Sequence, residues 1–229
     1  TNNLPDYSNM CHESSGKALV QTIGIGKGTV TLEDFNHADT ILVIGQNPGT
    51  NHPRMLTALR DAKLKGAKII HINPLPETGL VRFKHPQDYM KLNLSSTGLA
   101  DMHLQVKIGG DAALLRALNK LTIDAKSTDQ NFISEKTKSY NDFAKSLEVI
   151  DWDRIETDSG ISKSKITELS EIITNSKSII SCWAMGLTQH RNGVQVIQEV
   201  VNLHLLGGHI GRTGAGLCPV RGHSNVQGN

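Results

Sequence analysis

Short runs of apolar and β-branched residues predict the strands of this chain. Such runs cover residues 40–45, 67–73 and 178–183, and each is bounded by glycine or turn-forming residues. Runs of this kind are typical of strands that are buried on both faces of a parallel sheet. Residues 101–107 predict a further, shorter strand.

Between these runs, apolar residues recur at helical spacing. The predicted helices cover Ser14 to Gln21, Pro53 to Gly66, Asp111 to Leu121, Ser162 to Thr174 and Val194 to Leu205. A strand, a helix and a second strand in this order form a βαβ unit with a right-handed crossover. We therefore predict an α/β fold: a three-layer αβα, Rossmann-like domain with a mostly parallel, doubly wound sheet.

The pattern favours a single domain over residues 1–229. It divides into a leading segment (1–38), the sheet and its helices (39–215) and a cofactor or substrate loop (216–229). Residues 74–98 are expected to form a long loop or insertion, and residues 126–158 are polar and partly helical. Because the chain begins without Met and ends within a functional-looking loop, we expect it to be a piece of a longer protein.

Composition excludes several classes of protein. The net charge of +2 and the 4% of aromatic residues give no basis for a nucleic-acid groove. No apolar run approaches the roughly 20 residues that cross a bilayer, and the N-terminus lacks the features of a signal peptide. Three widely spaced cysteines argue against a disulfide scaffold. They favour a reducing compartment, so a cytoplasmic location is expected.

Polar and glycine residues follow the predicted strands. The segment Gly45-Gln-Asn-Pro-Gly-Thr-Asn51 ends one strand and opens a helix, where free N–H groups favour an anion. The alternative is an ordinary loop with a capping asparagine. Asn73 ends the next strand at the same edge, where a bound nucleotide would extend. Gly24-Ile-Gly-Lys-Gly-Thr29 follows a helix and matches no phosphate-binding spacing, so a simple turn is predicted there.

Two sites at opposite ends of the chain carry the candidate chemistry. Cys11 and His12 offer a thiolate beside an imidazole, a pairing that alone is more often accidental than catalytic. Arg221 lies in a glycine- and amide-rich segment suited to binding an anion. Cys182 is predicted to be a core residue, and Cys218 has no partner at metal-site spacing. The absence of any Cys-x-x-Cys argues against a zinc or iron–sulfur site within this chain.

Six ordered sequence blocks together resemble one enzyme family. They are Met-Cys-His-Glu-Ser-Ser-Gly, Ile-Gly-Gln-Asn-Pro-Gly-Thr-Asn-His-Pro, Gly-Ala-Lys-Ile-Ile, Ala-Asp-Met-His-Leu, Trp-Ala-Met-Gly-Leu-Thr-Gln and Pro-Val-Arg-Gly-His-Ser-Asn-Val-Gln-Gly. The chain resembles the molybdopterin-binding catalytic subunits of the formate dehydrogenase and dimethyl sulfoxide reductase group. The likeness is greatest to the formate-dehydrogenase-like branch.

The resemblance implies a role for each end of the chain. Cys11 would be a ligand to molybdenum or tungsten, His12 would accept a substrate proton, and Arg221 would orient a carboxylate. The metal would be held by two molybdopterin guanine dinucleotides. This domain would grip one of them through residues that follow its strands: Gly45, Asn47, Asn51, Asn73, Gly109, Asp111, Met185, Gln189, Gly222 and Asn225.

The implied chemistry is a two-electron reaction on a small substrate, with formate as the candidate. Electrons would leave through a 4Fe-4S cluster outside this chain, to an unidentified partner, and the rest of the protein's own chain would complete the site. Three departures affect substrate identity: Cys11 replaces selenocysteine, Asn73-Pro74 replaces Asp-Pro, and His223-Ser224 replaces Gln-Asn.

Two alternatives follow from the residues themselves. One is a thiol hydrolase or peroxidase in which His12 activates Cys11. The other is a non-catalytic nucleotide-binding module that retains the fold alone.

Overall fold

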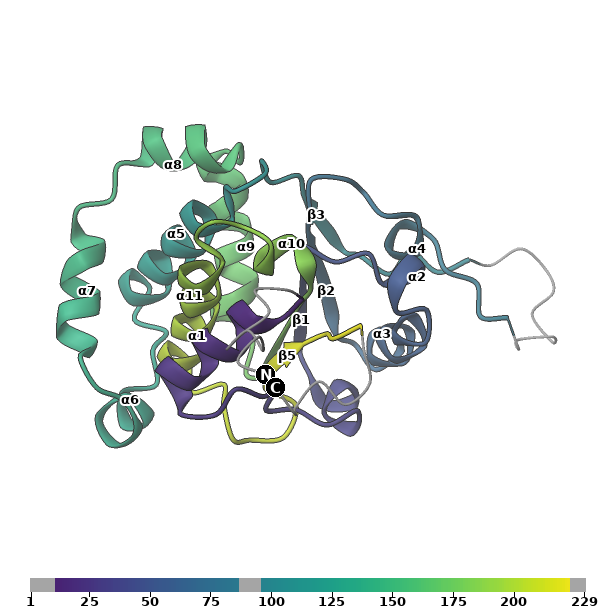
Figure 1. Cartoon of the computed structure of the whole chain (residues 1–229), viewed down its shortest axis with the longest axis horizontal. Helices are drawn as coiled ribbons and strands as arrows, with labels where there is room; N and C mark the ends of the chain where they lie inside the picture. The colour runs from purple at the N-terminus through teal and green to yellow at the C-terminus, as the bar shows by residue number, and fades with distance from the viewer. Residues whose placement is uncertain (1–10, 87–95, 223–229) are drawn as a thin grey trace, which may run out of the picture.

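The centre of the molecule is a five-stranded sheet in which every neighbouring pair of strands is parallel (Figure 1). The computed structural model describes residues 11–86 and 96–222. The strand order is β3-β2-β1-β4-β5. The strands are β1 Thr40–Ile44, β2 Lys68–Ile72, β3 Met102–Leu104, β4 Ile179–Trp183 and β5 Gly216–Pro219. The predicted α/β fold with a parallel sheet is confirmed.

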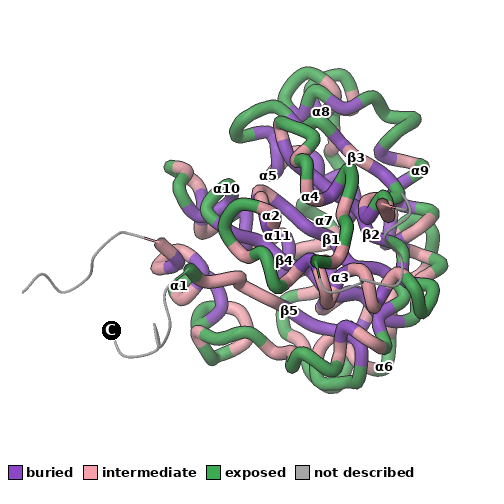
Figure 2. Tube along the Cα trace, turned by 90° about the vertical axis from the view of Figure 1, so that its right-hand side faces the viewer, coloured by how far each residue is buried: buried purple, intermediate pink, exposed green. Residues whose placement is uncertain are grey.

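Strands β1 and β4 form the buried middle of the sheet. Every residue of both strands is buried, and their register pairs Ile44 with Trp183 (Figure 2). Alternate residues of a strand face opposite sides, so each strand contributes to two apolar clusters. Leu42 and Ile44 belong to one cluster, whereas Ile41 and Val43 belong to the other. Burial on both faces explains the unbroken apolar runs in the sequence.

Helices cover both faces of the sheet and complete three layers. One face packs against the larger cluster, to which α1 Glu13–Ile23, α5 Asp111–Asp124, α9 Lys163–Thr174 and α11 Gly193–Leu206 contribute. The other face is covered by η1 Glu33–His37, α3 Met55–Leu64 and α4 Thr78–Val81. Two short helices, α2 Pro48–Asn51 and α10 Met185–Thr188, lie where β1 and β4 end.

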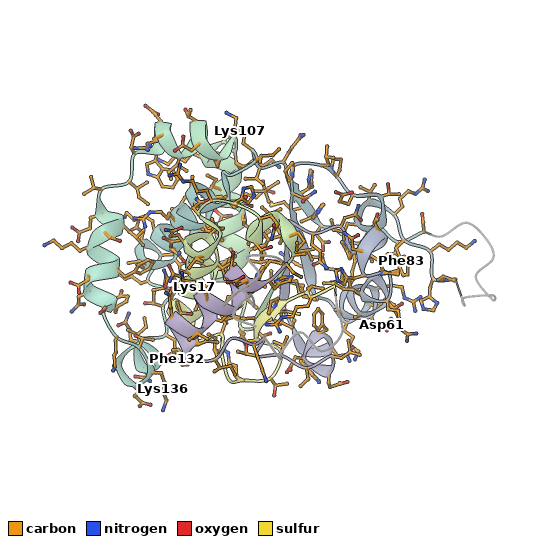
Figure 3. All side chains as sticks on the ribbon, in the orientation of Figure 1. Lys17, Asp61, Phe83, Lys107, Phe132 and Lys136 are labelled. Carbon is orange, nitrogen blue, oxygen red and sulfur yellow. The ribbon has the colours of Figure 1, made fainter. Side chains whose placement is uncertain are left out.

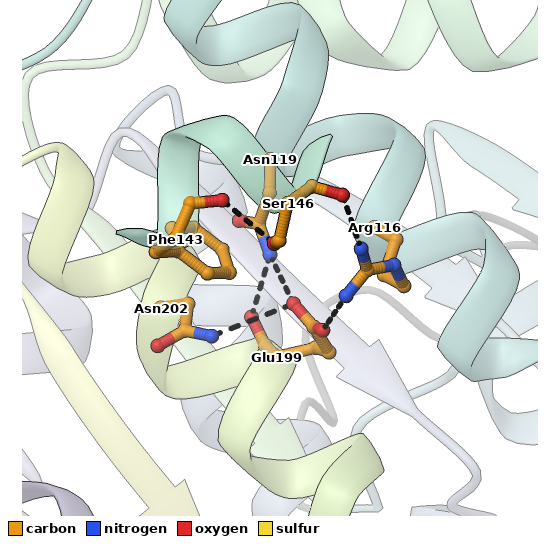
Figure 4. Close-up of polar contacts among 6 residues, drawn as sticks. All are labelled: Arg116, Asn119, Phe143, Ser146, Glu199 and Asn202. Atoms are coloured by element: carbon orange, nitrogen blue, oxygen red, sulfur yellow. Dashed lines mark hydrogen bonds and ion pairs between the residues drawn. The ribbon is translucent and has the colours of Figure 1, made fainter. Parts of the chain in front are cut away.

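The polar stretch 126–158 forms three helices outside the main helical layer (Figure 1). They are α6 Gln130–Lys136, α7 Tyr140–Glu148 and α8 Trp152–Ser159. The Glu199 carboxylate on α11 accepts hydrogen bonds from Arg116 at 3.0 Å and Asn119 at 2.8 Å, both on α5 (Figure 4). Arg116 also donates to the carbonyl of Ser146 on α7. This network joins α5, α7 and α11.

The structure differs from the sequence prediction at three places. Residues 216–219, expected within a loop, form strand β5. Its proline is tolerated because β5 is the last strand of the sheet. The stretch 74–98 contains α4 and a bridge between Phe83 and Thr97 in its described part. The expected strand over 101–107 is limited to Met102–Leu104, after which the chain turns and Val106 N–H donates to the Leu104 carbonyl.

Candidate cofactor site at the carboxyl edge of the sheet

Because all five strands are parallel, the loops that follow them share one edge of the sheet, here called the carboxyl edge. The connections after β1 and β4 lead to helices on opposite faces, which leaves a crevice between these two strands. The predicted residues follow β1 (Gly45, Asn47, Asn51), β2 (Asn73), β3 (Gly109, Asp111), β4 (Met185, Gln189) and β5 (Arg221, Gly222). Asn225 lies outside the described residues.

Two glycines meet at this crevice. Gly186 N–H donates to the Gly45 carbonyl at 3.0 Å. A Cβ on Gly45 would lie 2.8 Å from the Gly186 Cα, and a Cβ on Gly186 would lie 2.5 Å from the Gly45 Cα. Gly45 also has a φ of +56°, a conformation that side chains disfavour. Any larger residue at either position would therefore force the two loops apart.

Asn47 and Asn73 both bind one carboxylate. The amide groups of Asn47 and Asn73 donate to the two oxygens of Glu77, at 2.6 Å and 3.1 Å. The Asn47 side-chain oxygen also accepts from the Thr50 backbone N–H at 3.1 Å. These contacts join the ends of β1 and β2 and fix the loops between them. In the described structure, both asparagines thus have an evident structural role beside the predicted one.

The loop after β4 fixes the backbone at Cys11. Gln189 donates from its side-chain amide to the Cys11 carbonyl at 3.1 Å, and the Ser14 hydroxyl donates to the Thr188 carbonyl at 3.1 Å. Cys11 is a half-buried free thiol with a φ of +49°, in the left-handed region that few non-glycine residues adopt. Such strain persists only where the surrounding contacts impose it.

His12 connects the leading segment to the end of β5. Its Nε2 lies 2.8 Å from the Val220 carbonyl, which can only accept, so Nε2 carries the proton. Its Nδ1 therefore accepts from the Ser15 hydroxyl, 2.9 Å away. That hydroxyl in turn accepts from the Trp183 indole N–H at 2.9 Å. A buried chain of hydrogen bonds thus runs from β4 through α1 to the residue before Arg221.

Burial and nearby charges lower the pKa of His12 and so favour its neutral form. Burial lowers the pKa of its imidazole most, the bond to the Val220 carbonyl opposes that effect, and the charges of Arg221 and His52 lower the pKa further. Both ring nitrogens are engaged with protein atoms. His12 is therefore a positioning residue in this arrangement. To accept a proton at Nδ1 it would have to lose the hydrogen bond from Ser15.

Arg221 is held on both its backbone and its side chain. Its Nη2 donates to the Gly26 carbonyl at 2.7 Å, and its own carbonyl accepts from His52 Nε2 at 3.1 Å. The other ring nitrogen of His52 lies 3.4 Å from the Gln46 side-chain amide. His12 and His52 therefore bind the carbonyls of two consecutive residues, Val220 and Arg221.

Asp111 is the buried acid of this edge. It begins α5, and burial raises the pKa of its carboxyl to about 6, an effect that the charge of His190 partly opposes. The loop before it, which carries Lys107 (labelled in Figure 3), is fixed by α8. Lys107 Nζ donates to the Thr157 carbonyl at 2.8 Å, and a Cβ on Gly110 would lie 2.5 Å from the Asp158 carbonyl. A carboxyl with so perturbed a pKa is a candidate for a functional residue.

A groove of about 880 Å³ opens beside the Cys11 segment. It lies between α1 and the loop that leads into α11. Ser14 and Gln189, which hold Cys11 and its neighbours, line it together with the cationic side chains of Lys17 and Arg191. The carboxylate of Glu13 also lines the groove, so cationic and anionic side chains both face it.

The donor set of this edge suits a metal that is held mainly by a cofactor. Among residues 11–86 and 96–222, no three His, Cys, Asp or Glu side chains lie close enough to bind a metal ion. Cys11 would then supply a single soft thiolate. Two buried side-chain atoms near the ends of β1 and β2, Gln46 Oε1 and His71 Nε2, have no hydrogen-bond partner in the described structure. A buried polar atom without a partner in the protein is open to a hydrogen bond from a bound ligand, ion or water.

Comparison with known proteins identifies the family. The family model for molybdopterin oxidoreductases matches residues 1–228. An oxidoreductase of Mycobacterium tuberculosis is 48% identical over 235 residues, and formate dehydrogenase H of Escherichia coli is 30% identical over 228 residues. In both cases the match covers 100% of this chain and 30% of the relative. The acetylene hydratase of Pelobacter acetylenicus has the same fold, with a TM-score of 0.72 at 17% identity, over 90% of this chain and 25% of that one.

The chain therefore belongs to the molybdopterin oxidoreductase family, and that membership implies a molybdopterin cofactor. It spans about 30% of the length of the relatives named above. None of the helices in the described part of the chain is long and apolar enough to cross a membrane.

Several positioning residues were not predicted from the sequence. Ser15, Trp183, His52 and Glu77 act through contacts between segments that are distant in sequence, and such contacts leave no local signal. The glycine segment after α1 is a turn, as predicted, since Gly24 adopts the left-handed conformation that ends the helix. Its additional role, through the Gly26 carbonyl, is to hold Arg221.

Proposed function

We propose that the whole protein is a molybdenum or tungsten oxidoreductase that carries a bis(molybdopterin guanine dinucleotide) cofactor. This chain would supply the domain of that enzyme that binds one of the two guanine dinucleotides. The observation that carries the proposal is the bond from His12 to Val220, which brings Cys11 and Arg221, 210 positions apart in sequence, to one edge of the sheet. The proposed substrate is a small carboxylate, with formate as the candidate.

Each end of the chain has a distinct task in this proposal. Cys11 would bind the metal through its thiolate, because a soft sulfur ligand suits molybdenum and tungsten. The loops that follow the strands, together with Asp111, would hold the guanine dinucleotide. When bound, the cofactor would supply two-electron chemistry at its metal, with electrons leaving through a 4Fe-4S cluster outside this chain.

Arg221 would orient the substrate. A guanidinium has five N–H donors in a planar fork, and one Nη2 contact fixes it against the Gly26 carbonyl. The remaining donors suit bidentate binding of a carboxylate, which a lysine does not match. His12 would hold the Val220 carbonyl and thereby the Arg221 backbone. Transfer of a substrate proton to its Nδ1 would require the Ser15 hydroxyl to reverse its hydrogen bond.

The geometry does not favour a thiol hydrolase or peroxidase centred on Cys11. That chemistry needs a base within hydrogen-bond reach of the thiol. His12 directs Nδ1 at Ser15 and Nε2 at Val220, so its two nitrogens are engaged away from the sulfur. The hydrolase or peroxidase hypothesis therefore lacks the base, His12, on which it depends.

The test is metal and pterin analysis of the whole protein, together with turnover of formate by an artificial electron acceptor. We expect molybdenum or tungsten and pterin in the wild type. Cys11→Ser should lower turnover by at least about 100-fold while pterin is retained. Cys218→Ser is the matched control, because it also removes a half-buried thiol but should retain turnover.

Three results would contradict different parts of the proposal. A folded whole protein without molybdenum, tungsten and pterin would exclude the cofactor and leave a non-catalytic module. A loaded protein whose turnover is unchanged by Cys11→Ser would exclude Cys11 as the metal ligand. A protein that contains the cofactor but does not turn over formate would still belong to the proposed enzyme class, and formate would be excluded as its substrate.

A further inference from the structure

Two cysteines with no part in the cofactor site lie side by side in the sheet. Cys182 on β4 and Cys218 on β5 are register partners on adjacent parallel strands. Both belong to the same face of the sheet, where Cys182 is part of the smaller apolar cluster and Cys218 packs against it. Their side chains therefore project in the same direction from neighbouring backbones.

The spacing of the pair is compatible with a disulfide. Neighbouring strands lie about 4.8 Å apart, within the range of about 4.4–6.8 Å between Cα atoms in disulfides. The neighbouring Cys182 side chain lowers the pKa of the Cys218 thiol, whereas burial raises the pKa of Cys182.

The two cysteines differ in burial. Cys182 is completely buried, and Cys218 is half-buried. Cys218 lines an apolar groove of about 730 Å³ between η1, α3 and the end of β5, together with Val30, Met55 and Val220. A small reagent that enters this groove therefore reaches Cys218 before it reaches Cys182. The less buried cysteine is also the one whose thiol has the lowered pKa, which is the arrangement expected of an attacking cysteine with a buried resolving partner.

We propose that Cys182 and Cys218 form a reversible dithiol–disulfide site that responds to small hydroperoxides. The Cys218 thiolate attacks the hydroperoxide, the O–O bond breaks, and sulfenic acid and an alcohol form. The Cys182 sulfur then attacks the sulfenic sulfur. The S–S bond forms, and the hydroxyl leaves as water with the proton of Cys182. Two thiols and one hydroperoxide give one disulfide, one alcohol and one water.

The disulfide would act on the end of β5. β5 is the last strand of the sheet, and it leads directly to Val220, whose carbonyl is bound by His12, and to Arg221. Drawing Cys218 toward Cys182 should displace this segment. The inference does not rest on the proposed function, because bond formation between the two sulfurs requires neither cofactor nor turnover.

The experiment uses the whole purified protein and tert-butyl hydroperoxide as the probe. After treatment, remaining thiols are alkylated and the protein is digested with trypsin without reduction. Cleavage after Lys177, Arg191, Arg212 and Arg221 releases Cys182 in peptide 178–191 and Cys218 in peptide 213–221. We expect these two peptides as one linked species, two hydrogens lighter than their sum, which dithiothreitol separates.

Variants distinguish the roles of the thiols. Cys182→Ser should abolish the link and leave Cys218 oxidised to sulfinic acid, whereas Cys11→Ser should form the link as the wild type does. Hydrogen exchange over residues 216–222 should change on oxidation of the wild type and return after reduction. The proposal is overturned if the wild type gives two separately alkylated peptides, or if Cys218 proceeds to sulfinic acid while Cys182 stays a free thiol.

Discussion

The carboxyl edge of the sheet and the opposite edge, where the strands begin and which is here called the amino edge, differ in the hydrogen bonding of their buried polar groups. At the amino edge, His204 lies between Ser181 Oγ at 2.7 Å and the His209 carbonyl at 3.2 Å, and Arg212 donates to the ring of His209. At the carboxyl edge, Asp111 is buried with a raised pKa, Cys11 has a left-handed backbone, and Gln46 Oε1 has no partner among the described residues. The polar groups around His204 are hydrogen-bonded within the protein, whereas Gln46 Oε1 is not.

The difference indicates where the molecule is built to bind. A buried polar group that is fully hydrogen-bonded stabilises the fold, whereas one that is not reduces stability until a ligand completes it. Histidines show the contrast directly. His204 connects α11 to the middle of β4. In contrast, His12 binds the carbonyl of Val220, and His52 binds the carbonyl of Arg221, the residue predicted to orient the substrate.

The largest expected effect is acid destabilisation of the amino edge. Burial lowers the pKa of His204 to about 4 and that of His209 to about 3, from 6.5. Because both folded-state pKa values are depressed, their contribution is fully present above about pH 6.5 and is lost as the pH falls toward 4 and 3. We expect a loss of about 2 kcal/mol for each histidine, about 4 kcal/mol for the two together, between pH 7 and pH 4.5.

Hydrogen exchange of the β4 amides as a function of pH measures this loss in the whole protein. His204→Asn, which removes one of the two titrations, should reduce the pH dependence by about half. If the pH dependence of exchange is unchanged in that variant, then His204 does not gain a proton on unfolding.

The next effect is that of truncating the same histidine at neutral pH. His204→Ala leaves a cavity and an unpaired Ser181 hydroxyl, so we expect the free energy of unfolding to fall by about 3 kcal/mol. His37→Ala is the control, because that side chain is 51% exposed and should change stability by less than about 0.5 kcal/mol. A loss below about 1 kcal/mol for His204→Ala would contradict the stabilising role assigned to this edge.

The smallest effect has the opposite sign and lies at the carboxyl edge. Burial raises the pKa of Asp111 to about 6, so this carboxyl stabilises the fold below about pH 4 and loses that contribution as the pH rises through 6. Asp111→Asn should therefore stabilise the protein by about 2 kcal/mol at pH 8 and by little at pH 4. The same change should reduce pterin retention after gel filtration. A variant that is less stable at pH 8 would mean that Asp111 serves the fold.

The sequence predicted the sheet well because its signal is local. The runs at β1, β2 and β4 are strands buried on both faces, and such runs differ plainly from amphipathic helices. β5 was not predicted, because the apolar run within Gly-Leu-Cys-Pro is too short to indicate a strand. The segment becomes a strand through its pairing with β4. Tertiary context decides the structure of segments like this one.

The sequence named candidate site residues but not the contacts that hold them in place. The resemblance carried Cys11, His12 and Arg221, and the structure places all three at one edge. The bonds that hold them there involve Ser15, Gly26 and His52. These are ordinary residues in sequence, so only the folded chain reveals what they do. The roles of the three predicted residues in catalysis remain predictions.

The most direct test of the account is hydrogen exchange with and without the cofactor. The whole protein would be compared as isolated from a host that makes molybdopterin and from one that does not. We predict slower exchange in the loaded protein at residues 45–51, 105–111, 184–193 and 220–222, and unchanged exchange at the amino-edge residues 207–215. Equal protection of both edges, or protection at the amino edge alone, would contradict the claim that the carboxyl edge holds the cofactor.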